Sequence, residues 1–101
     1  MTFSLEQLNA RIASRATASP DESYTAKLLN DGIDRTARKF GEEAVELVIE
    51  SKDNNRDLFL GEAADLMYHF LVLLAAKGIR MDDVVEVLQS RHSAGKSDAS
   101  N

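Results

Sequence analysis

Two short stretches of the sequence place several carboxylates at helical spacing inside apolar surroundings. Residues 41–50 read Gly-Glu-Glu-Ala-Val-Glu-Leu-Val-Ile-Glu, and residues 61–70 read Gly-Glu-Ala-Ala-Asp-Leu-Met-Tyr-His-Phe. Residues three or four apart lie on one edge of a helix. The groups that share an edge are Glu42, Glu43 and Glu46 in the first stretch, and Glu62, Asp65 and His69 in the second.

Carboxylates gathered in this way call for a cation. If the two stretches face each other across packed helices, their charges repel by several kcal/mol at the effective dielectric of a protein. Hard oxygen ligands suit magnesium, which binds through carboxylates together with substrate phosphates. The chain has no cysteine and only two histidines, which disfavours zinc. The sequence therefore predicts a magnesium site.

An ordinary explanation of the same acids stays open. Acidic side chains are common on solvated helix faces, and in the first turn of a helix they interact favourably with its dipole. Two features weigh against this explanation. Glu62 and Asp65 directly precede the most apolar run of the chain, and Glu46 is flanked on both sides by apolar residues.

Apolar spacing and capping residues predict the helices that must position these acids. Five are expected, over roughly residues 4–15, 23–29, 33–52, 56–77 and 81–92. No segment has the alternation of a strand, so the predicted fold is an all-α helical bundle. The short turn at residues 53–55 makes an antiparallel hairpin of the third and fourth helices. This hairpin can bring Glu43 and Glu46 opposite Glu62 and Asp65.

The fourth expected helix is apolar on nearly every face between residues 66 and 76. Such a helix must be covered all round, and a chain of 101 residues has few elements to cover it. We therefore expect a homodimer with this helix at its centre. Gly41, inside the third expected helix, costs about 1 kcal/mol relative to alanine, and we expect it to mark the close approach of a neighbouring backbone or a ligand.

Composition is that of one soluble domain, with 44% apolar and 29% charged residues. The domain is expected over residues 1–92, followed by a small, polar and disordered tail over residues 93–101. The net charge of -5 and the pI near 4.9 argue against nucleic acid or an anionic membrane as the main partner. The absence of cysteine excludes disulfides and a cysteine nucleophile.

The expected location is the cytoplasm. The N-terminus has no basic segment followed by an apolar run, so no secretory signal is expected. The apolar run over residues 66–76 is interrupted by His69 and is much shorter than the roughly 20 residues that span a bilayer. It is expected to be core or interface.

The spacing Glu43-x-x-Glu46, fifteen residues, Glu62-x-x-Asp65 resembles the magnesium-binding motif of the all-α nucleoside triphosphate pyrophosphohydrolase (MazG-like) superfamily. A more specific resemblance, to the phosphoribosyl-ATP pyrophosphatase family, covers about residues 4–92. It is carried by four runs, Ser23-Tyr-Thr-Ala-Lys-Leu28, Asp34-Arg35, Lys39-Phe-Gly-Glu-Glu-Ala-Val-Glu46 and Glu62-Ala-Ala-Asp-Leu-Met-Tyr-His69.

This resemblance implies an all-α fold completed by dimerisation, and hydrolysis of phosphoribosyl-ATP to phosphoribosyl-AMP and diphosphate, the second step of histidine biosynthesis. It also implies that one or more magnesium ions are held by Glu42, Glu43, Glu46, Glu62 and Asp65. Two departures are visible. Phe40 stands where the family usually has a smaller aliphatic residue, and Gly61 stands where an acid is frequent. Neither departure removes a motif carboxylate.

No Ser-His-Asp or Cys-His arrangement is discernible, so direct attack by water is the natural hypothesis. One motif glutamate not fully committed to metal would accept the proton, and both Glu43 and Glu46 are candidates.

Basic residues just before the acidic stretch are candidates for binding substrate phosphates, namely Lys27, Arg35 and Lys39, with less weight on Arg38. Ordinary solvated side chains are the alternative. Tyr24 either stacks on a base or caps the core, the latter being favoured. His69 either contacts substrate or metal or is a core histidine with its hydrogen bonds satisfied, the latter being favoured.

Two other functions stay open. A house-cleaning nucleoside triphosphate pyrophosphohydrolase would share the metal site and differ in its pocket, and a helical interaction module would bind no metal. In many organisms the domain resembles one half of a fusion with phosphoribosyl-AMP cyclohydrolase, a cysteine-dependent zinc enzyme. Because this chain lacks cysteine, we expect a separate cyclohydrolase to receive the product.

Overall fold

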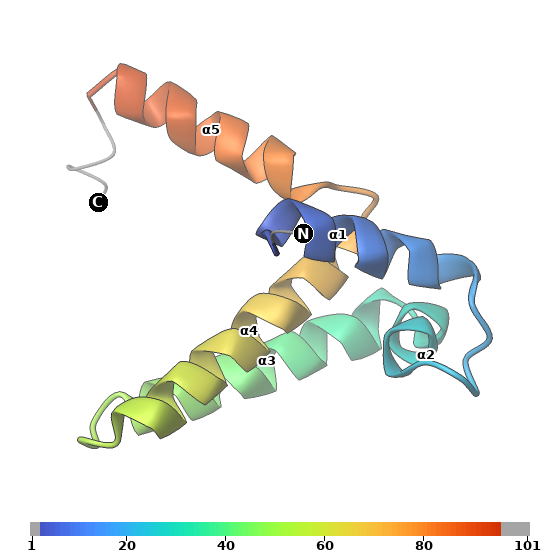
Figure 1. The fold of residues 1–101 in the computed structure, drawn as a ribbon, viewed down its shortest axis with the longest axis horizontal. Helices are drawn as coiled ribbons and strands as arrows, with labels where there is room; N and C mark the ends of the chain where they lie inside the picture. The colour runs from blue at the N-terminus through green and yellow to red at the C-terminus, as the bar shows by residue number, and fades with distance from the viewer. Residues whose placement is uncertain (1–2, 96–101) are drawn as a thin grey trace.

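Helices joined by short turns make up the computed structural model, which describes residues 3–95 (Figure 1). The elements are α1 (Leu5–Ser14), a 3-10 turn (Arg15–Thr17), α2 (Tyr24–Asp31), α3 (Ile33–Glu50), α4 (Arg56–Ala76) and α5 (Met81–Ser93). No strand occurs between residues 3 and 95. The predicted all-α fold is confirmed, and each of the five predicted helices is present with ends that shift by at most a few residues.

Side-chain caps explain where three of the helices begin. The Ser4 hydroxyl accepts a hydrogen bond from the Gln7 backbone N–H at 3.1 Å, and the Ser23 hydroxyl accepts one from Ala26 at the same distance. The Asn55 side chain accepts from Leu58 at 3.0 Å. Each cap satisfies a backbone donor that has no partner inside its own helix. These short polar residues thus set the starts of α1, α2 and α4.

The hairpin of α3 and α4 makes the most extensive contact between any two elements (Figure 1). The turn between these helices is so short that they must run antiparallel along most of their length. The rings of Phe40 on α3 and Phe70 on α4 pack with centroids 5.9 Å apart. The hairpin predicted from the sequence is confirmed, and it fixes which faces of α3 and α4 meet.

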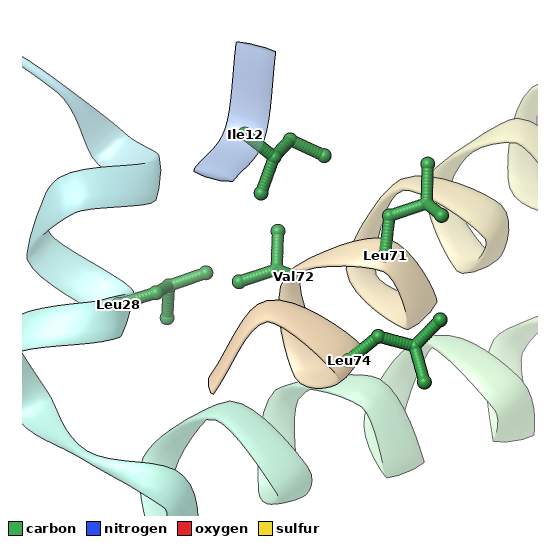
Figure 2. Close-up of a cluster of buried hydrophobic side chains, with 5 residues drawn as sticks. All are labelled: Ile12, Leu28, Leu71, Val72 and Leu74. Carbon is green, nitrogen blue, oxygen red and sulfur yellow. The ribbon is translucent and has the colours of Figure 1, made fainter. Parts of the chain in front are cut away.

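The buried apolar core lies where α1 and α2 cross one end of α4 (Figure 2). It contains Ile12 of α1, Leu28 of α2, and Leu71, Val72 and Leu74 of α4. None of these five core side chains comes from α3. The core therefore holds one end of the hairpin against α1 and α2. The other end of the hairpin does not pack against either of these helices.

Large apolar side chains are exposed along the uncovered part of the hairpin. They include Val45, Val48 and Ile49 on α3 and Leu58, Leu60 and Met67 on α4. An apolar cavity of about 280 Å³ lies between the two helices, lined by Phe40, Leu47, Ala63, Leu66, Met67 and Phe70. Residues 3–95 of one chain therefore do not cover α4 all round, as the dimer hypothesis expects.

Helix α5 extends away from the rest of the molecule (Figure 1) and has no buried residue. Its start is tied to α1, because the Met81 N–H donates to the Asn9 side chain at 3.2 Å. The predicted tail begins at Ser93, which is the last residue of α5, and residues 96–101 lie outside the described part of the chain.

The expectation for Gly41 is contradicted as far as a neighbouring backbone is concerned, because a Cβ built there would meet no atom of the described residues within 4 Å. That a ligand approaches Gly41 stays a prediction. By contrast, Gly32 between α2 and α3 has a φ of 99°, a conformation that other residues rarely adopt. The backbone conformation thus explains why position 32 is glycine. No contact among the described residues explains why position 41 is glycine.

By length and composition alone, α4 is apolar enough to cross a membrane. It also carries Glu62, Asp65 and His69 near its middle. A charged side chain at the centre of a bilayer costs about 2.5–3.5 kcal/mol even on the lowest scales. These groups favour a helix packed against protein.

Candidate functional site

Three carboxylates from α3 and α4 form what we call the acidic centre, Glu43, Glu62 and Asp65. One oxygen of each lies within 4.8 Å of an oxygen of the other two. Glu43, on α3, is only 7% exposed, whereas Asp65 on α4 is open to solvent. The hairpin thus brings together acids that are about twenty residues apart in the sequence, as predicted.

Glu46 lies one helical turn beyond Glu43 and adjoins the acidic centre. The pKa of the Glu62 carboxyl is raised above its ordinary value, first by a hydrogen bond with Glu46 and then by partial loss of solvent. The negative charges of Glu46, Asp65 and Glu43 add to the shift. The shift shows that negative charge gathers at this point, and a cation bound at the acidic centre would relieve the same repulsion.

The donor set fits a hard divalent cation. Its atoms are all carboxylate oxygens, which magnesium and calcium prefer, and the group contains no thiolate. One member is buried, so its charge is not fully screened by water. The arrangement therefore has both the ligand chemistry and the electrostatic need for such an ion.

Glu42, the remaining predicted metal ligand, lies apart from the acidic centre. Its side chain is 57% exposed, and its nearest ionic partner is Lys39 at 4.0 Å. Consecutive residues of a helix point about 100° apart. The packing that turns Glu43 toward α4 therefore turns Glu42 away, and Glu42 as a metal ligand stays a prediction.

Lys39 connects the acidic centre to a basic surface. Its ammonium group lies 3.3 Å from a carboxylate oxygen of Glu43. The pKa of Lys39 is raised, chiefly by its hydrogen bond with Glu43, with smaller contributions from Tyr24 and Glu42. Lys39 is thus held as a cation beside the acids.

A cavity of about 350 Å³, here called the basic cavity, lies next to Lys39 and is lined by Tyr24, Arg35, Arg38, Lys39 and Glu42. Of the predicted substrate-binding residues, Arg35 and Lys39 line it. Lys27 is not part of the lining, and its ammonium group lies 3.7 Å from a carboxylate oxygen of Asp31. Arg35 also lies near that carboxylate, at 3.9 Å. Arg38, which received less weight from the sequence, is part of the lining.

Tyr24 and His69 join α2 to α4 beside the acidic centre. The His69 Nδ1 lies 2.7 Å from the backbone carbonyl oxygen of Asp65, which can only accept, so Nδ1 carries the proton. Nε2 then accepts from the Tyr24 hydroxyl, at 2.8 Å. Next to this pair, the Thr25 and Tyr68 hydroxyls are hydrogen bonded. The prediction of a satisfied, buried histidine is confirmed.

The preferred prediction for Tyr24 is wrong. Its side chain is 52% exposed and lines the basic cavity rather than the core. Its hydroxyl is nevertheless partly shielded, and burial is the first cause that raises the pKa of Tyr24 above its ordinary value.

Comparison with known proteins identifies relatives of this arrangement. A statistical model of the family described as phosphoribosyl-ATP pyrophosphohydrolase matches residues 5–92. The chain is 46% identical over 98 residues to the phosphoribosyl-ATP pyrophosphatase of Jannaschia sp., with 96% of each chain covered. It is 50% identical over 90 residues to the protein of the same name from Allorhizobium ampelinum, covering 89% of this chain and 86% of that one.

Proposed function

The chain belongs to the phosphoribosyl-ATP pyrophosphohydrolase family, and we propose that it hydrolyses phosphoribosyl-ATP to phosphoribosyl-AMP and diphosphate. This is the second step of histidine biosynthesis. The observation that carries the proposal is the acidic centre, in which three carboxylate oxygens from facing helices lie within 4.8 Å of one another. The basic cavity beside it supplies positive charge for a substrate that is rich in phosphates.

In this proposal Glu43, Glu62 and Asp65 hold one or more magnesium ions, with Glu42 as a further ligand when the site is loaded. Bound magnesium would neutralise phosphate charge and lower the pKa of a coordinated water. The raised pKa of Glu62 supports this role, because excess negative charge gathers at this point. Arg35 and Lys39 then bind and orient substrate phosphates, and Arg38 joins them from the same cavity.

Glu46 is the better candidate for the general base. Glu43 belongs to the acidic centre and is paired with Lys39, so its lone pairs are committed. Glu46 adjoins the centre through Glu62 without being one of its three members. A carboxylate in that position can accept a proton from water while its neighbours hold the cation.

A homodimer is part of the proposal. The apolar side chains exposed along α3, α4 and α5 support it, because a patch of this kind on a soluble protein marks an interface. We further propose that the dimer works in the cytoplasm and that a separate phosphoribosyl-AMP cyclohydrolase takes up its product. No contact between the two enzymes is needed for that transfer.

A substrate panel tests the proposed function. The protein is incubated with phosphoribosyl-ATP, ATP, dCTP or dUTP, with magnesium or with EDTA, and the release of diphosphate is measured. We expect phosphoribosyl-ATP to be preferred and EDTA to abolish turnover. A clear preference for dCTP or dUTP would instead identify a house-cleaning pyrophosphohydrolase.

Magnesium binding separates the enzyme from an interaction module. A ligand that binds only the folded state at a hundredfold excess over its Kd stabilises it by about 2.7 kcal/mol. We therefore expect magnesium to raise the thermal unfolding temperature. No heat of binding and no stabilisation in such a titration would favour the module.

A further inference from the structure

A second polar cavity opens beside Tyr24, between α1, the start of α2, and α4. It has a volume of about 220 Å³, and we call it the α1–α2 cavity. Its polar lining includes Arg11 near the end of α1, Arg15 just after α1, Glu22 before α2, and the aromatic side chains of Tyr24 and Tyr68. Neither arginine takes part in the magnesium site or the basic cavity described above.

Two guanidinium groups in this cavity lack an anionic partner. Arg11 and Arg15 are one helical turn apart, and neither forms an ion pair with any residue between 3 and 95. The chain as a whole is acidic, with a net charge of -5, so carboxylates are plentiful elsewhere. Guanidinium groups suit bidentate binding of a phosphate. The cavity thus presents two unpaired phosphate-binding side chains.

The rest of the lining fits a phosphorylated sugar better than a free phosphate. Glu22 would repel a phosphate alone, but its carboxylate can accept hydrogen bonds from sugar hydroxyls. Tyr24 and Tyr68 add aromatic surface against which a sugar or base can pack. A ligand with both a phosphate and hydroxyl groups would use both the basic and the acidic side chains of the lining.

Tyr24 joins this cavity to the proposed active site. It lines both the α1–α2 cavity and the basic cavity, and the latter contains Lys39, which contacts Glu43 of the acidic centre. Phosphoribosyl-ATP is a substrate with two charged ends, a triphosphate and the 5-phosphate of its added ribose. Two cavities that share Tyr24, one beside the acidic centre and one lined by Arg11 and Arg15, match that distribution of charge.

We propose that the α1–α2 cavity binds the phosphoribosyl group of the substrate, with Arg11 and Arg15 on its phosphate and Glu22 on its hydroxyls. The inference rests on the proposed function, since it assigns a second subsite for the same substrate. It also explains how the enzyme would prefer phosphoribosyl-ATP to ATP, because ATP has no group to fill this cavity. Arg11 and Arg15 are then specificity-determining residues.

A purely structural role for the arginines predicts something different. Both lie near the C-terminus of α1, where a positive charge interacts favourably with the helix dipole. Their loss would then lower thermal stability and leave substrate preference unchanged. The test must therefore measure substrate preference and stability on the same proteins.

The experiment compares the wild type with the double variant Arg11→Gln and Arg15→Gln. We expect the KM for phosphoribosyl-ATP to rise roughly ten- to a hundredfold, because two charge-assisted contacts are lost. ATP has no group to fill this cavity, so its inhibition constant against the same reaction should change by less than about threefold. A double variant with lysine at both positions keeps the charge and should recover part of the loss. Arg56→Gln, at the exposed start of α4, is the matched control.

An unchanged KM in a folded glutamine variant would overturn the proposal, and so would an equal loss of affinity for ATP. If the glutamine variant fails to fold, the lysine variant carries the same comparison. Calorimetry with ribose 5-phosphate measures binding to the cavity directly. It tests the subsite even if the wild type does not hydrolyse phosphoribosyl-ATP. Binding in the wild type that is lost in the variant would support the subsite alone, and no binding would reject it.

Discussion

At the scale of single residues, the chemistry depends on which of several similar carboxylates occupies which position. Glu43 is buried and paired with Lys39, Glu62 lies beside Glu46, which raises the pKa of its carboxyl, and Asp65 is exposed. Because these three carboxylates have different surroundings, the same kind of substitution should have a different effect at each position.

Glu46→Gln should remove the proton acceptor and leave the metal ligands in place. We expect kcat to fall by about 10²–10⁴-fold, the usual contribution of a general base, while magnesium still raises the thermal unfolding temperature. Glu43→Gln should instead weaken the stabilisation by magnesium. Unchanged turnover of the Glu46→Gln protein at saturating magnesium would contradict the assignment.

Glu62→Gln should stabilise the protein in the absence of metal. The folded-state pKa of Glu62 is raised above its ordinary value of 4.5, so the folded protein binds this proton more readily than the unfolded chain does. Its contribution to stability is therefore present below that value and is lost as pH rises through the raised pKa. At pH 7 in EDTA the variant should unfold at a higher temperature than the wild type.

The same Glu62→Gln protein should gain less stability from magnesium and should lose activity, because a ligand is missing. The matched control is Glu86→Gln on α5, because Glu86 does not belong to the acidic centre. Thermal unfolding between pH 4 and 8, with and without magnesium, makes the comparison. A lower unfolding temperature of Glu62→Gln in EDTA would show that repulsion is not the dominant effect.

At the scale of elements, the α3–α4 hairpin is the part of the fold that assembles the acidic centre. Its caps and short turn hold the helices antiparallel, and the core at one end anchors them to α1 and α2. The tie between Tyr24 and His69 adds a second link between α2 and α4 close to the acids. The geometry of the centre therefore depends on one helix pair with support from one side.

Gly41→Ala tests whether anything outside the protomer approaches α3. Since a Cβ here meets nothing within 4 Å, the substitution should stabilise the helix by about 1 kcal/mol. The thermal unfolding temperature should then rise by about 4–8 °C for a domain of this size. Gly32→Ala should have the opposite effect, because its φ of 99° strains any other residue.

A destabilised Gly41→Ala protein would mean that a partner subunit occupies the space beside this glycine. A stable protein with a raised KM would point to the substrate instead. Gly61→Ala on α4, where a Cβ also meets nothing within 4 Å, provides the comparison on the facing helix.

At the scale of the whole molecule, the chain exposes more apolar surface than its small core can account for. Val45, Val48 and Ile49 on α3 are 59%, 60% and 58% exposed, and α5 presents Val85, Val87 and Leu88 to solvent. Fully burying one such side chain is worth about 1.5–3 kcal/mol. A second copy of the chain that covers these residues would add substantially to the stability of a small domain.

The double variant Val45→Glu and Val48→Glu should therefore weaken the dimer. Light scattering after size exclusion should give a mass near 11.1 kDa for the variant and twice this value for the wild type. Lys52→Glu, beyond the end of α3, is a control for the change in charge. A wild type that stays monomeric at high concentration would remove the dimer from the proposal.

By itself the sequence determined the local features of this protein. The Ser4, Ser23 and Asn55 caps, the turn at Gly32 and the apolar spacing of residues 33–50 depend only on near neighbours, so the helix ends followed from them. The motif spacing and the resemblance carried by it also indicated the family, which the comparisons confirm.

Only the tertiary structure decided which side chains meet. Glu42 and Glu43 are consecutive and chemically equal, and the packing of α3 on α4 turned only one of them into the acidic centre. Likewise the hydrogen bond from Tyr24 to His69 and the cavity shared by Arg11, Arg15 and Tyr24 join residues from different helices. Periodicity repeats within one helix, whereas the rotation of each helix against its neighbours depends on the side chains of all of them at once.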